Sequence, residues 1–220
     1  MKTRPGEIER GSMAIIDAEL AARGIALPED SAAVIRRCIH ASADFDYAEN
    51  LRFTPDAVRR AVAALRAGAQ IVTDTNMAKA GVSLPGLRRL GGAVHCFMAE
   101  PEVAAAAKAR GTTRAAAAVE HAAARFPEAV YAVGNAPTAL FTLADRIGEG
   151  LRPALVVAVP VGFVNVTESK ERVFEVCAAA GVPCIAAMGR KGGSSIAAAI
   201  LNALIYTAAE LLDPAARGWD

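Results

Sequence analysis

From residue 71 onward, short apolar segments alternate with longer helical ones. The apolar segments are residues 71–73, 93–97, 129–133, 154–159 and 183–186. The helical segments that separate and follow them are residues 101–110, 113–125, 137–147, 168–180 and 194–212. This alternation is typical of βαβ units, whose strands form a parallel sheet covered by helices on both faces. The sequence therefore predicts an α/β fold with an open, mostly parallel sheet of about five strands.

The first 67 residues follow a different pattern, which is helical throughout. Helices are expected at residues 5–22 and 28–39, and a third is expected to begin at Thr54, which would be its N-cap, followed by Pro55 and Asp56. A chain of 220 residues is within the size of one hydrophobic core, and no Gly/Ser-rich or Pro-rich linker divides it. We therefore expect one domain over residues 1–220, with a helical N-terminal part at residues 1–67 packed on the sheet.

Composition excludes several classes of partner. The 24 Lys and Arg residues nearly balance the 23 Asp and Glu residues, and aromatic residues make up only 5%, so a nucleic-acid partner is not expected. Residues 192–209 carry no charge, but glycine, serine and asparagine interrupt them, which indicates a buried helix and not a membrane span. The N-terminal residues do not resemble a secretory signal, so a cytoplasmic protein is expected.

The cysteines and acidic clusters do not predict a metal site. Cys38, Cys96, Cys177 and Cys184 form no CxxC pair and lie in apolar surroundings, where buried free thiols are expected. Asp44, Asp46 and Glu49 lack the spacing of an EF-hand or of a histidine–carboxylate metal triad. We interpret these three acidic residues as helix-capping and solvent-exposed.

Polar and flexible residues follow the predicted strands, at residues 74–77, 98–100, 134–138, 160–165 and 189–194. Ligands of open α/β sheets bind at the carboxyl ends of the strands. The last segment, GRKGGS, supplies glycines, two cations and a hydroxyl at a helix start, a combination that favours an anion. It is not a P-loop, and no dinucleotide fingerprint is present. The alternative is a glycine-rich turn with solvated cations.

His40 is the histidine best suited to acid–base chemistry. It ends a helical segment in which Arg36 and Arg37 lie four and three residues earlier, on the same side of the helix. Neighbouring cations disfavour the imidazolium form, which indicates a proton donor and acceptor active near neutral pH. The alternative is a helix-terminal histidine that interacts with backbone carbonyls. His121 is interpreted as a surface or packing residue, and His95 and Cys96 should point to opposite faces of a strand.

Five strings together resemble the precorrin-8X / cobalt-precorrin-8 methylmutase family of cobalamin biosynthesis. They are IHASADFDYAE (39–49), TDTNMAKAG (73–81), GNAPTALF (134–141), VPVGFVNVTESKE (159–171) and GRKGGSSIAAAILNAL (189–204). The resemblance spans nearly the whole chain. Residues 165–167 depart from it, because relatives commonly carry small residues at these positions.

The resemblance implies an isomerase that moves a methyl group from ring carbon eleven to ring carbon twelve of a corrin precursor. No redox cofactor, nucleotide or metal is implied for the protein. His40 matches the family's histidine, whose implied role is proton transfer to the macrocycle. The ADFD string and the lysine of GRKGG favour the cobalt-handling reaction, from cobalt-precorrin-8 to cobyrinate. The alternative is the cobalt-free reaction, from precorrin-8X to hydrogenobyrinate.

An apolar macrocycle fringed with carboxylates requires apolar walls with dispersed cations, amides and hydroxyls. The residues expected to bind it are Ser12, Thr75, Arg114, Asn135, Thr138, Gly162, Arg190, Lys191, Gly192, Gly193 and Ser194. The resemblance also implies a homodimer with the corrinoid near the subunit interface. Two alternatives from other classes are a non-catalytic corrinoid carrier and, from the fold alone, a flavodoxin-like FMN oxidoreductase.

Overall fold

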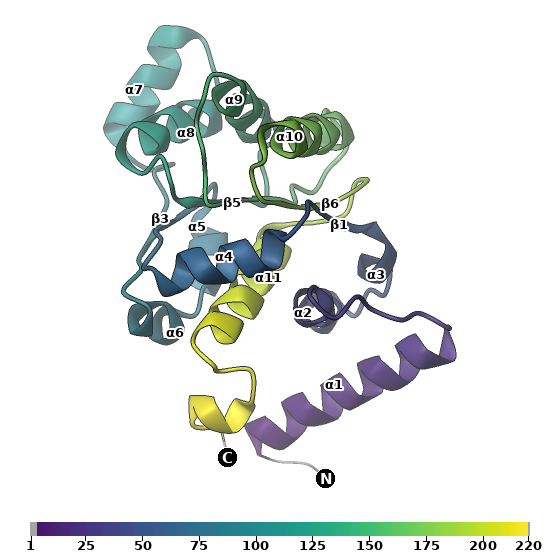
Figure 1. The fold of residues 1–220 in the computed structure, drawn as a ribbon. Coiled ribbons are helices and arrows are strands. Elements are labelled where there is room, and N and C mark those ends of the chain that lie inside the picture. The colour runs from purple at the N-terminus through teal and green to yellow at the C-terminus, as the bar shows by residue number, and fades with distance from the viewer. Residues whose placement is uncertain (1–3, 220) are drawn as a thin grey trace.

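The computed structural model describes residues 4–219, which form a six-stranded sheet between two layers of helices (Figure 1). The strand order is β1-β6-β5-β4-β2-β3. The strands are β1 (Leu51–Phe53), β2 (Ile71–Thr73), β3 (Val94–His95), β4 (Val130–Val133), β5 (Leu155–Ala158) and β6 (Cys184–Ala187). All neighbouring pairs are parallel except β1 with β6.

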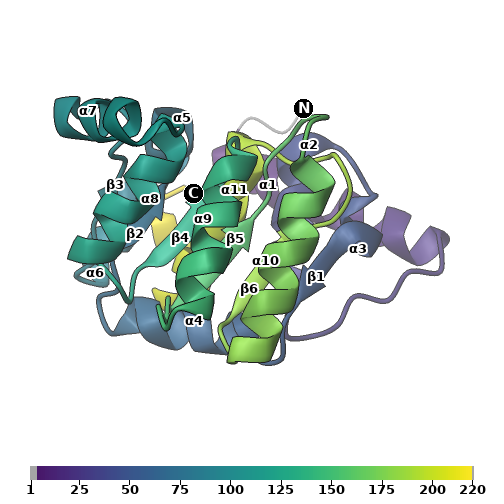
Figure 2. The same cartoon turned by 90° about the horizontal axis from the view of Figure 1, so that it is seen from above.

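Helices cover both faces of this sheet (Figure 1). The upper layer consists of α7 (Pro101–Arg110), α8 (Arg114–Arg125), α9 (Pro137–Gly148) and α10 (Val166–Ala180). Figure 2 shows α8, α9 and α10 side by side over the sheet. The lower layer consists of α4 (Ala57–Arg66), α5 (Asn76–Gly81), α6 (Leu84–Arg89) and α11 (Ser194–Ala208). Below them lie α1 (Pro5–Ala22), α2 (Ala32–Ser42), α3 (Tyr47–Asn50) and the 3-10 helix η1 (Pro214–Arg217).

Each central strand contributes to two hydrophobic cores, one on each face. In β4, Val130 and Ala132 belong to the lower core, whereas Tyr131 and Val133 belong to the upper core. This follows from the two-residue repeat of a strand, which sends successive side chains to opposite faces. Burial on both faces explains why these strands are continuous apolar segments in the sequence.

All five predicted strands are present, and the mostly parallel α/β sheet is confirmed. The sixth strand, β1, lies within the N-terminal part that was expected to be helical. It pairs Leu51 with Ala187 and Phe53 with Ile185. A three-residue segment carries little periodicity of its own, and its partner lies more than 130 residues away in the sequence, so local pattern could not reveal it.

The prediction for the start of α4 was wrong. The helix begins at Ala57, and its N-cap is Asp56, at φ 59°. The Thr54 hydroxyl instead accepts a hydrogen bond from the backbone N–H of Cys184 at 2.8 Å and lies 3.4 Å from the carbonyl of Val182. Thr54 therefore extends the contact between β1 and β6 and does not cap a helix.

The structure confirms the buried helix and the burial of three of the four cysteines, and it corrects the bounds of one N-terminal helix. Helix α11 is almost entirely buried, and no helix in residues 4–219 is long and apolar enough to cross a membrane. The cysteines are free thiols: Cys38, Cys177 and Cys184 are buried, and Cys96 is partly exposed. Helix α2 begins at Ala32 and not at Pro28, and it extends to Ser42.

Candidate functional site

The crevice expected to bind a ligand lies where neighbouring strands send their following helices to opposite faces. After β2 the chain continues into α5 below the sheet, whereas after the adjacent β4 it continues into α9 above the sheet. In open α/β sheets this divergence opens a crevice at the carboxyl ends of the strands. The loops at these ends are residues 74–76, 134–138, 160–165 and 189–194, and we call them together the rim.

Asp74 joins the two sides of this crevice. Its carboxylate accepts hydrogen bonds at 2.8 Å from the backbone N–H groups of Gly134, Asn135 and Ala136. Burial raises the pKa of Asp74, and the three donors oppose this by stabilising the carboxylate. Asp74 therefore fixes the backbone at Asn135.

Ser194 and Gly134 meet across the same crevice. The hydroxyls of Thr75 and Ser194 lie 2.7 Å apart, and Thr75 also caps α5 by accepting a hydrogen bond from the Ala78 N–H. A Cβ atom on Gly134 would lie 2.8 Å from the Cα of Ser194. Glycine is required here because two backbone segments approach each other closely.

The glycines of the rim make a second close approach. Gly193 donates its N–H to the carbonyl of Val159 at 2.8 Å, and a Cβ on Gly192 would lie 2.2 Å from that carbonyl oxygen. Gly162 donates to the carbonyl of Arg190 at 3.2 Å. The three glycines have φ values of 146°, 156° and 123° at positions 162, 192 and 193, which side chains rarely tolerate.

Lys170 supports the last rim loop from the protein interior. This α10 residue is fully buried, and its ammonium donates to the carbonyls of Gly189 and Lys191, each at 2.8 Å. The two acceptors flank Arg190, so the clamp fixes the backbone that carries this arginine. Burial lowers the pKa of Lys170 to about 8.

Lys191 is not the free cation that the sequence suggested. Its ammonium lies 2.7 Å from a carboxylate oxygen of Asp44 and 2.5 Å from one of Asp46. The interpretation of Asp44 and Asp46 as helix-capping residues is corrected accordingly, because both carboxylates bind a loop that lies about 145 residues further along the sequence. These contacts tie the segment after α2 to the rim and neutralise the charge of Lys191.

Arg190 and Arg114 remain available as cations. Among residues 4–219, neither lies within 4.0 Å of a carboxylate, and both are exposed. The guanidinium of Arg190 lies 5.5 Å from the ring centroid of Phe163, which is itself exposed in the 160–165 loop. Arg114 begins α8 next to Thr113, whose hydroxyl lies 2.8 Å from that of Thr138 in α9. Arg114 and Thr138 are therefore held together at the starts of neighbouring helices.

His40 lies in the last turn of α2, exposed to solvent. Partial burial lowers the pKa of His40, and the charge of Arg37 lowers it further, whereas the carboxylate of Glu9 opposes the shift. The effect expected of Arg36 is absent, because Arg36 pairs with Asp17 at 2.5 Å. The residues that follow His40 in the sequence reach the rim, because Asp44 and Asp46 pair there with Lys191.

Ser12 is the predicted residue that the structure leaves apart from the others. It lies in α1, where its hydroxyl donates to the carbonyl of Ile8 in the same helix at 3.0 Å. Helix α1 packs on α2 and η1.

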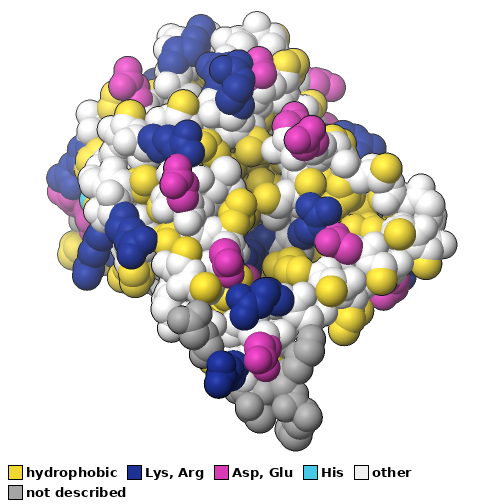
Figure 3. Space-filling model, turned by 60° about the horizontal axis from the view of Figure 1, so that its bottom comes forward, with side chains coloured by type: hydrophobic (Ala, Val, Ile, Leu, Met, Phe, Trp, Pro, Cys, Tyr) yellow, Lys and Arg dark blue, Asp and Glu magenta, His cyan; other side chains and the backbone are white. Residues whose placement is uncertain are grey.

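Figure 3 shows that the bottom face is hollowed, with charged side chains among hydrophobic ones. A cavity of about 550 Å³ lies between α1, α2 and residues 212–214.

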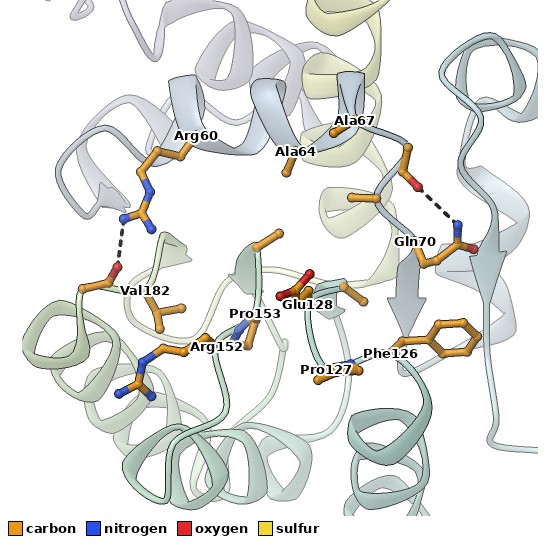
Figure 4. Close-up of a pocket in the computed structure, with 15 residues that line it drawn as sticks. Arg60, Ala64, Ala67, Gln70, Phe126, Pro127, Glu128, Arg152, Pro153 and Val182 are labelled. Atoms are coloured by element: carbon orange, nitrogen blue, oxygen red, sulfur yellow. Dashed lines mark hydrogen bonds between the residues drawn. The ribbon is translucent and has the colours of Figure 1, made fainter.

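A further cavity of about 600 Å³ lies at the opposite edge of the sheet, among segments that precede β2, β4, β5 and β6 (Figure 4). Its polar groups are partly satisfied within the protein: Arg60 donates to the carbonyl of Gly181, and Gln70 donates to that of Gly68. It contains none of the predicted site residues. The rim therefore remains the candidate site.

The rim combines four features that suit a large anionic ligand. Helices α9, α10 and α11 begin there, and the positive end of a helix dipole favours an anion. Around it lie the guanidinium groups of Arg114 and Arg190, which pair with no carboxylate of residues 4–219, together with several hydroxyls and exposed apolar side chains such as Phe163. Asp74 and Lys170, which shape it, were missed from the sequence. Asp74 directly follows a strand, which was a usable signal, whereas Lys170 lies in a charged helical segment that resembles a solvent-exposed surface.

Comparison with known proteins identifies the family. The profile of the precorrin-8X methylmutase family matches residues 7–207. The cobalt-precorrin-8 methylmutase of Leptospira interrogans is 41% identical over 203 residues, which cover 90% of this chain and 91% of that protein. The precorrin-8X methylmutase of Pseudomonas aeruginosa is 42% identical over 201 residues, covering 90% and 93%. A crystal structure of precorrin-8X methylmutase from Thermus thermophilus matches with a TM-score of 0.82 and 42% identity, covering 92% of this chain and 98% of that one. The chain therefore belongs to the precorrin-8X methylmutase family and is an isomerase.

Proposed function

We propose that this cytoplasmic enzyme moves a methyl group from ring carbon eleven to ring carbon twelve of a corrin precursor in cobalamin biosynthesis. The observation that carries the proposal is the assembly of four separate loops into one rim, fixed by Asp74 and Lys170. The reaction is an isomerisation, in which one carbon–carbon bond breaks and an equivalent one forms. It consumes no electrons and no co-substrate.

Binding and orientation are assigned to the rim. Arg114 and Arg190 hold substrate carboxylates, and Thr75, Asn135, Thr138 and Ser194 offer neutral hydrogen bonds. The glycines at positions 162, 192 and 193 keep the backbone close to the ligand. Because the methyl shift is intramolecular, holding the macrocycle in its reactive geometry supplies much of the catalysis. Lys191 orders the loop through Asp44 and Asp46, and Ser12 contributes from α1.

Proton transfer is assigned to His40. Its lowered pKa leaves the imidazole mainly neutral at neutral pH, so that it can take up a proton from solvent and, as the more acidic imidazolium, pass this proton to a ring atom of the macrocycle. Protonation of the conjugated system makes it receptive to the migrating methyl group, and the proton returns when the product forms.

The decisive experiment is incubation with precorrin-8X and with its cobalt complex separately, followed by identification of a product of unchanged mass. Both substrates are needed, because relatives named for each form match at similar identity, 41% and 42%. Conversion of the cobalt complex alone would support cobalt-precorrin-8 as the substrate. Recovery of both ligands unchanged would refute catalysis and leave a corrinoid carrier.

His40→Ala isolates the chemical step. The variant should fold and bind a corrinoid, because the proposed contacts are spread over many residues, whereas single-turnover conversion should fall by about 100-fold or more. His121→Ala is the matched control, since His121 lies on α8 beside Phe97 with ring centroids 4.9 Å apart. A folded His40→Ala variant that converts substrate at the wild-type rate would overturn the assignment.

The proposal includes a homodimer. Large apolar side chains are exposed at Ile15, Met77, Phe163 and Val164, with exposed fractions of 68%, 71%, 81% and 78%. These side chains offer apolar surface that a second copy of the chain would cover. Light scattering at micromolar concentration should give twice the chain mass of 22.7 kDa. A fully active monomer would rule the dimer out.

A further inference from the structure

Arg217 is a buried cation whose donors are only partly used. Its side chain is 7% exposed, and its guanidinium lies 2.6 Å from a carboxylate oxygen of Glu9 through Nη2. Within residues 4–219, its Nε and Nη1 atoms are buried and have no hydrogen-bond partner. Buried donors of a charged group are rarely left unpaired, because desolvation of such a group is costly.

The charges around Arg217 do not balance. The carboxylate of Glu9 forms ion pairs with two guanidinium groups, that of Arg37 at 2.9 Å and that of Arg217 at 2.6 Å between nitrogen and oxygen. The exposed fractions of the three side chains are between 7% and 13%. Among residues 4–219, two buried cations therefore share one buried anion, which leaves one positive charge without a partner in this part of the chain. A buried excess charge requires an opposite charge or a strong hydrogen-bond acceptor nearby.

A cavity of about 360 Å³ opens beside this group. Arg217 lines it together with Arg89, Tyr206 and Trp219. The guanidinium of Arg217 lies 4.6 Å from the ring centroid of Tyr206 and 4.9 Å from that of Trp219. Arg89 is exposed at the end of α6 and, among the described residues, has no carboxylate within 4.0 Å. Two guanidinium groups thus face a small space with aromatic walls.

The C-terminal segment is fixed firmly enough to form such a site. Gly6 of α1 lies directly against the backbone of Trp219, where a Cβ would be 2.0 Å from the carbonyl oxygen. Asp213 caps η1 by accepting a hydrogen bond from the Ala215 N–H and also pairs with Arg10 at 3.1 Å. These contacts hold Arg217 between Tyr206 and Trp219.

We infer that this cavity binds a carboxylate group, with Arg217 and Arg89 as its cationic partners. One carboxylate supplies the negative charge that is missing among residues 4–219 and lies beside the guanidinium of Arg217, and the aromatic walls suit a short hydrocarbon chain behind it. The site is separate from the rim. Tyr206 lies twelve residues after Ser194 along α11, which corresponds to about 18 Å. The cavity is nevertheless electrostatically close to His40, because the charge of Arg217 contributes to the lowered pKa of that histidine. The inference rests on the charge count and the cavity and not on the proposed function.

Trp219 is the only tryptophan in the chain, so its fluorescence reports on this cavity alone. The protein is titrated with sodium propionate and, separately, with sodium chloride at the same ionic strength. Propionate should change the emission in a saturable manner, whereas chloride should not. A response to propionate no larger than that to chloride would overturn the inference.

Variants assign the response to the two arginines. Arg217→Gln should weaken propionate binding by about 10-fold or more, the loss expected for one charged hydrogen-bonding partner. Arg89→Gln should also weaken it, and this exposed position decides the matter if Arg217→Gln fails to fold by circular dichroism. Arg88→Gln is the matched control, because it removes the same charge one residue away, outside the residues that line the cavity. Equal binding in the Arg88→Gln and Arg89→Gln variants would overturn the inference.

A competition experiment distinguishes two sources of the carboxylate, a side chain of a corrinoid and a separate small molecule. A corrinoid with free acid side chains is titrated by calorimetry with and without propionate, and a corrinoid whose acids are converted to amides serves as the control. Competition with the acid form alone would identify the occupant as an arm of that ligand. Independent binding of propionate and the acid form would identify a separate small carboxylate. Failure of both corrinoids to bind would count against the proposed function while leaving the propionate result intact.

Discussion

Replacement of Lys170 by methionine should remove a buried charge together with the two hydrogen bonds to the carbonyls of residues 189 and 191. The folded pKa of this lysine is about 8, against an ordinary value of 10.5. At neutral pH the amine carries its proton in both the folded and the unfolded chain. Above pH 8 the folded chain loses this proton while the unfolded chain keeps it, so the stability of the wild type rises with pH.

The size of this effect follows from the gap between the two pKa values. Each unit of difference is equivalent to about 1.4 kcal/mol. The free energy of unfolding of the wild type, minus that of Lys170→Met, should therefore increase by about 2–3 kcal/mol between pH 7 and pH 10. Groups that titrate in both proteins cancel in this difference. The neutral amine still has two N–H donors for its two carbonyls, so the clamp should survive deprotonation.

Urea unfolding at several pH values measures the difference, and the exposed Lys108→Met variant controls for the loss of a lysine in general. The same Lys170→Met variant should raise KM for the corrin substrate more than it lowers kcat, because it loosens the backbone at Arg190 without touching the reacting atoms. A difference in unfolding free energy that stays flat or falls with increasing pH would refute the reasoning. So would an unchanged KM.

Three other changes test the rim. Asp74→Asn replaces one acceptor oxygen with an NH₂ group, so at least one of the three backbone N–H groups that it holds loses its partner. Urea unfolding should show a loss of about 1–3 kcal/mol, and a loss below about 0.5 kcal/mol would contradict this account. Gly134→Ala should lower the free energy of unfolding by about 1–3 kcal/mol, because it forces a Cβ atom against Ser194. Gly148→Ala is the control and should not destabilise the protein, because the space around Gly148 is open. Similar melting temperatures for the two variants would argue against the close approach. Arg190→Ala should weaken corrinoid binding by about 10-fold and make it less dependent on salt. Lys191→Ala should weaken binding less, because Asp44 and Asp46 already neutralise Lys191. Calorimetry at two salt concentrations measures both variants, and a larger loss for Lys191→Ala would contradict this reasoning.

Local pattern in the sequence determined most of the secondary structure and the edge of the sheet that carries the site. The strands β2 to β6 could be predicted because burial on both faces makes each of them a continuous apolar segment bounded by polar loops. The carboxyl-end loops could be predicted as the binding edge because parallel strands all end on the same side. Glycines 192 and 193 were also visible as a helix start with unusual backbone freedom.

Only the tertiary structure decided which groups are free and which are already paired. Lys191 looked like a substrate-binding cation, but chain folding brings Asp44 and Asp46 within 2.7 Å of it. Lys170 lies in a charged helical segment, yet its ammonium is buried and donates hydrogen bonds to two carbonyls of a loop 19 and 21 residues away. The antiparallel pairing of β1 with β6, and the sharing of Glu9 between Arg37 and Arg217, were likewise decided by the tertiary structure. Pairing and burial depend on neighbours distant in sequence, and no local periodicity records them.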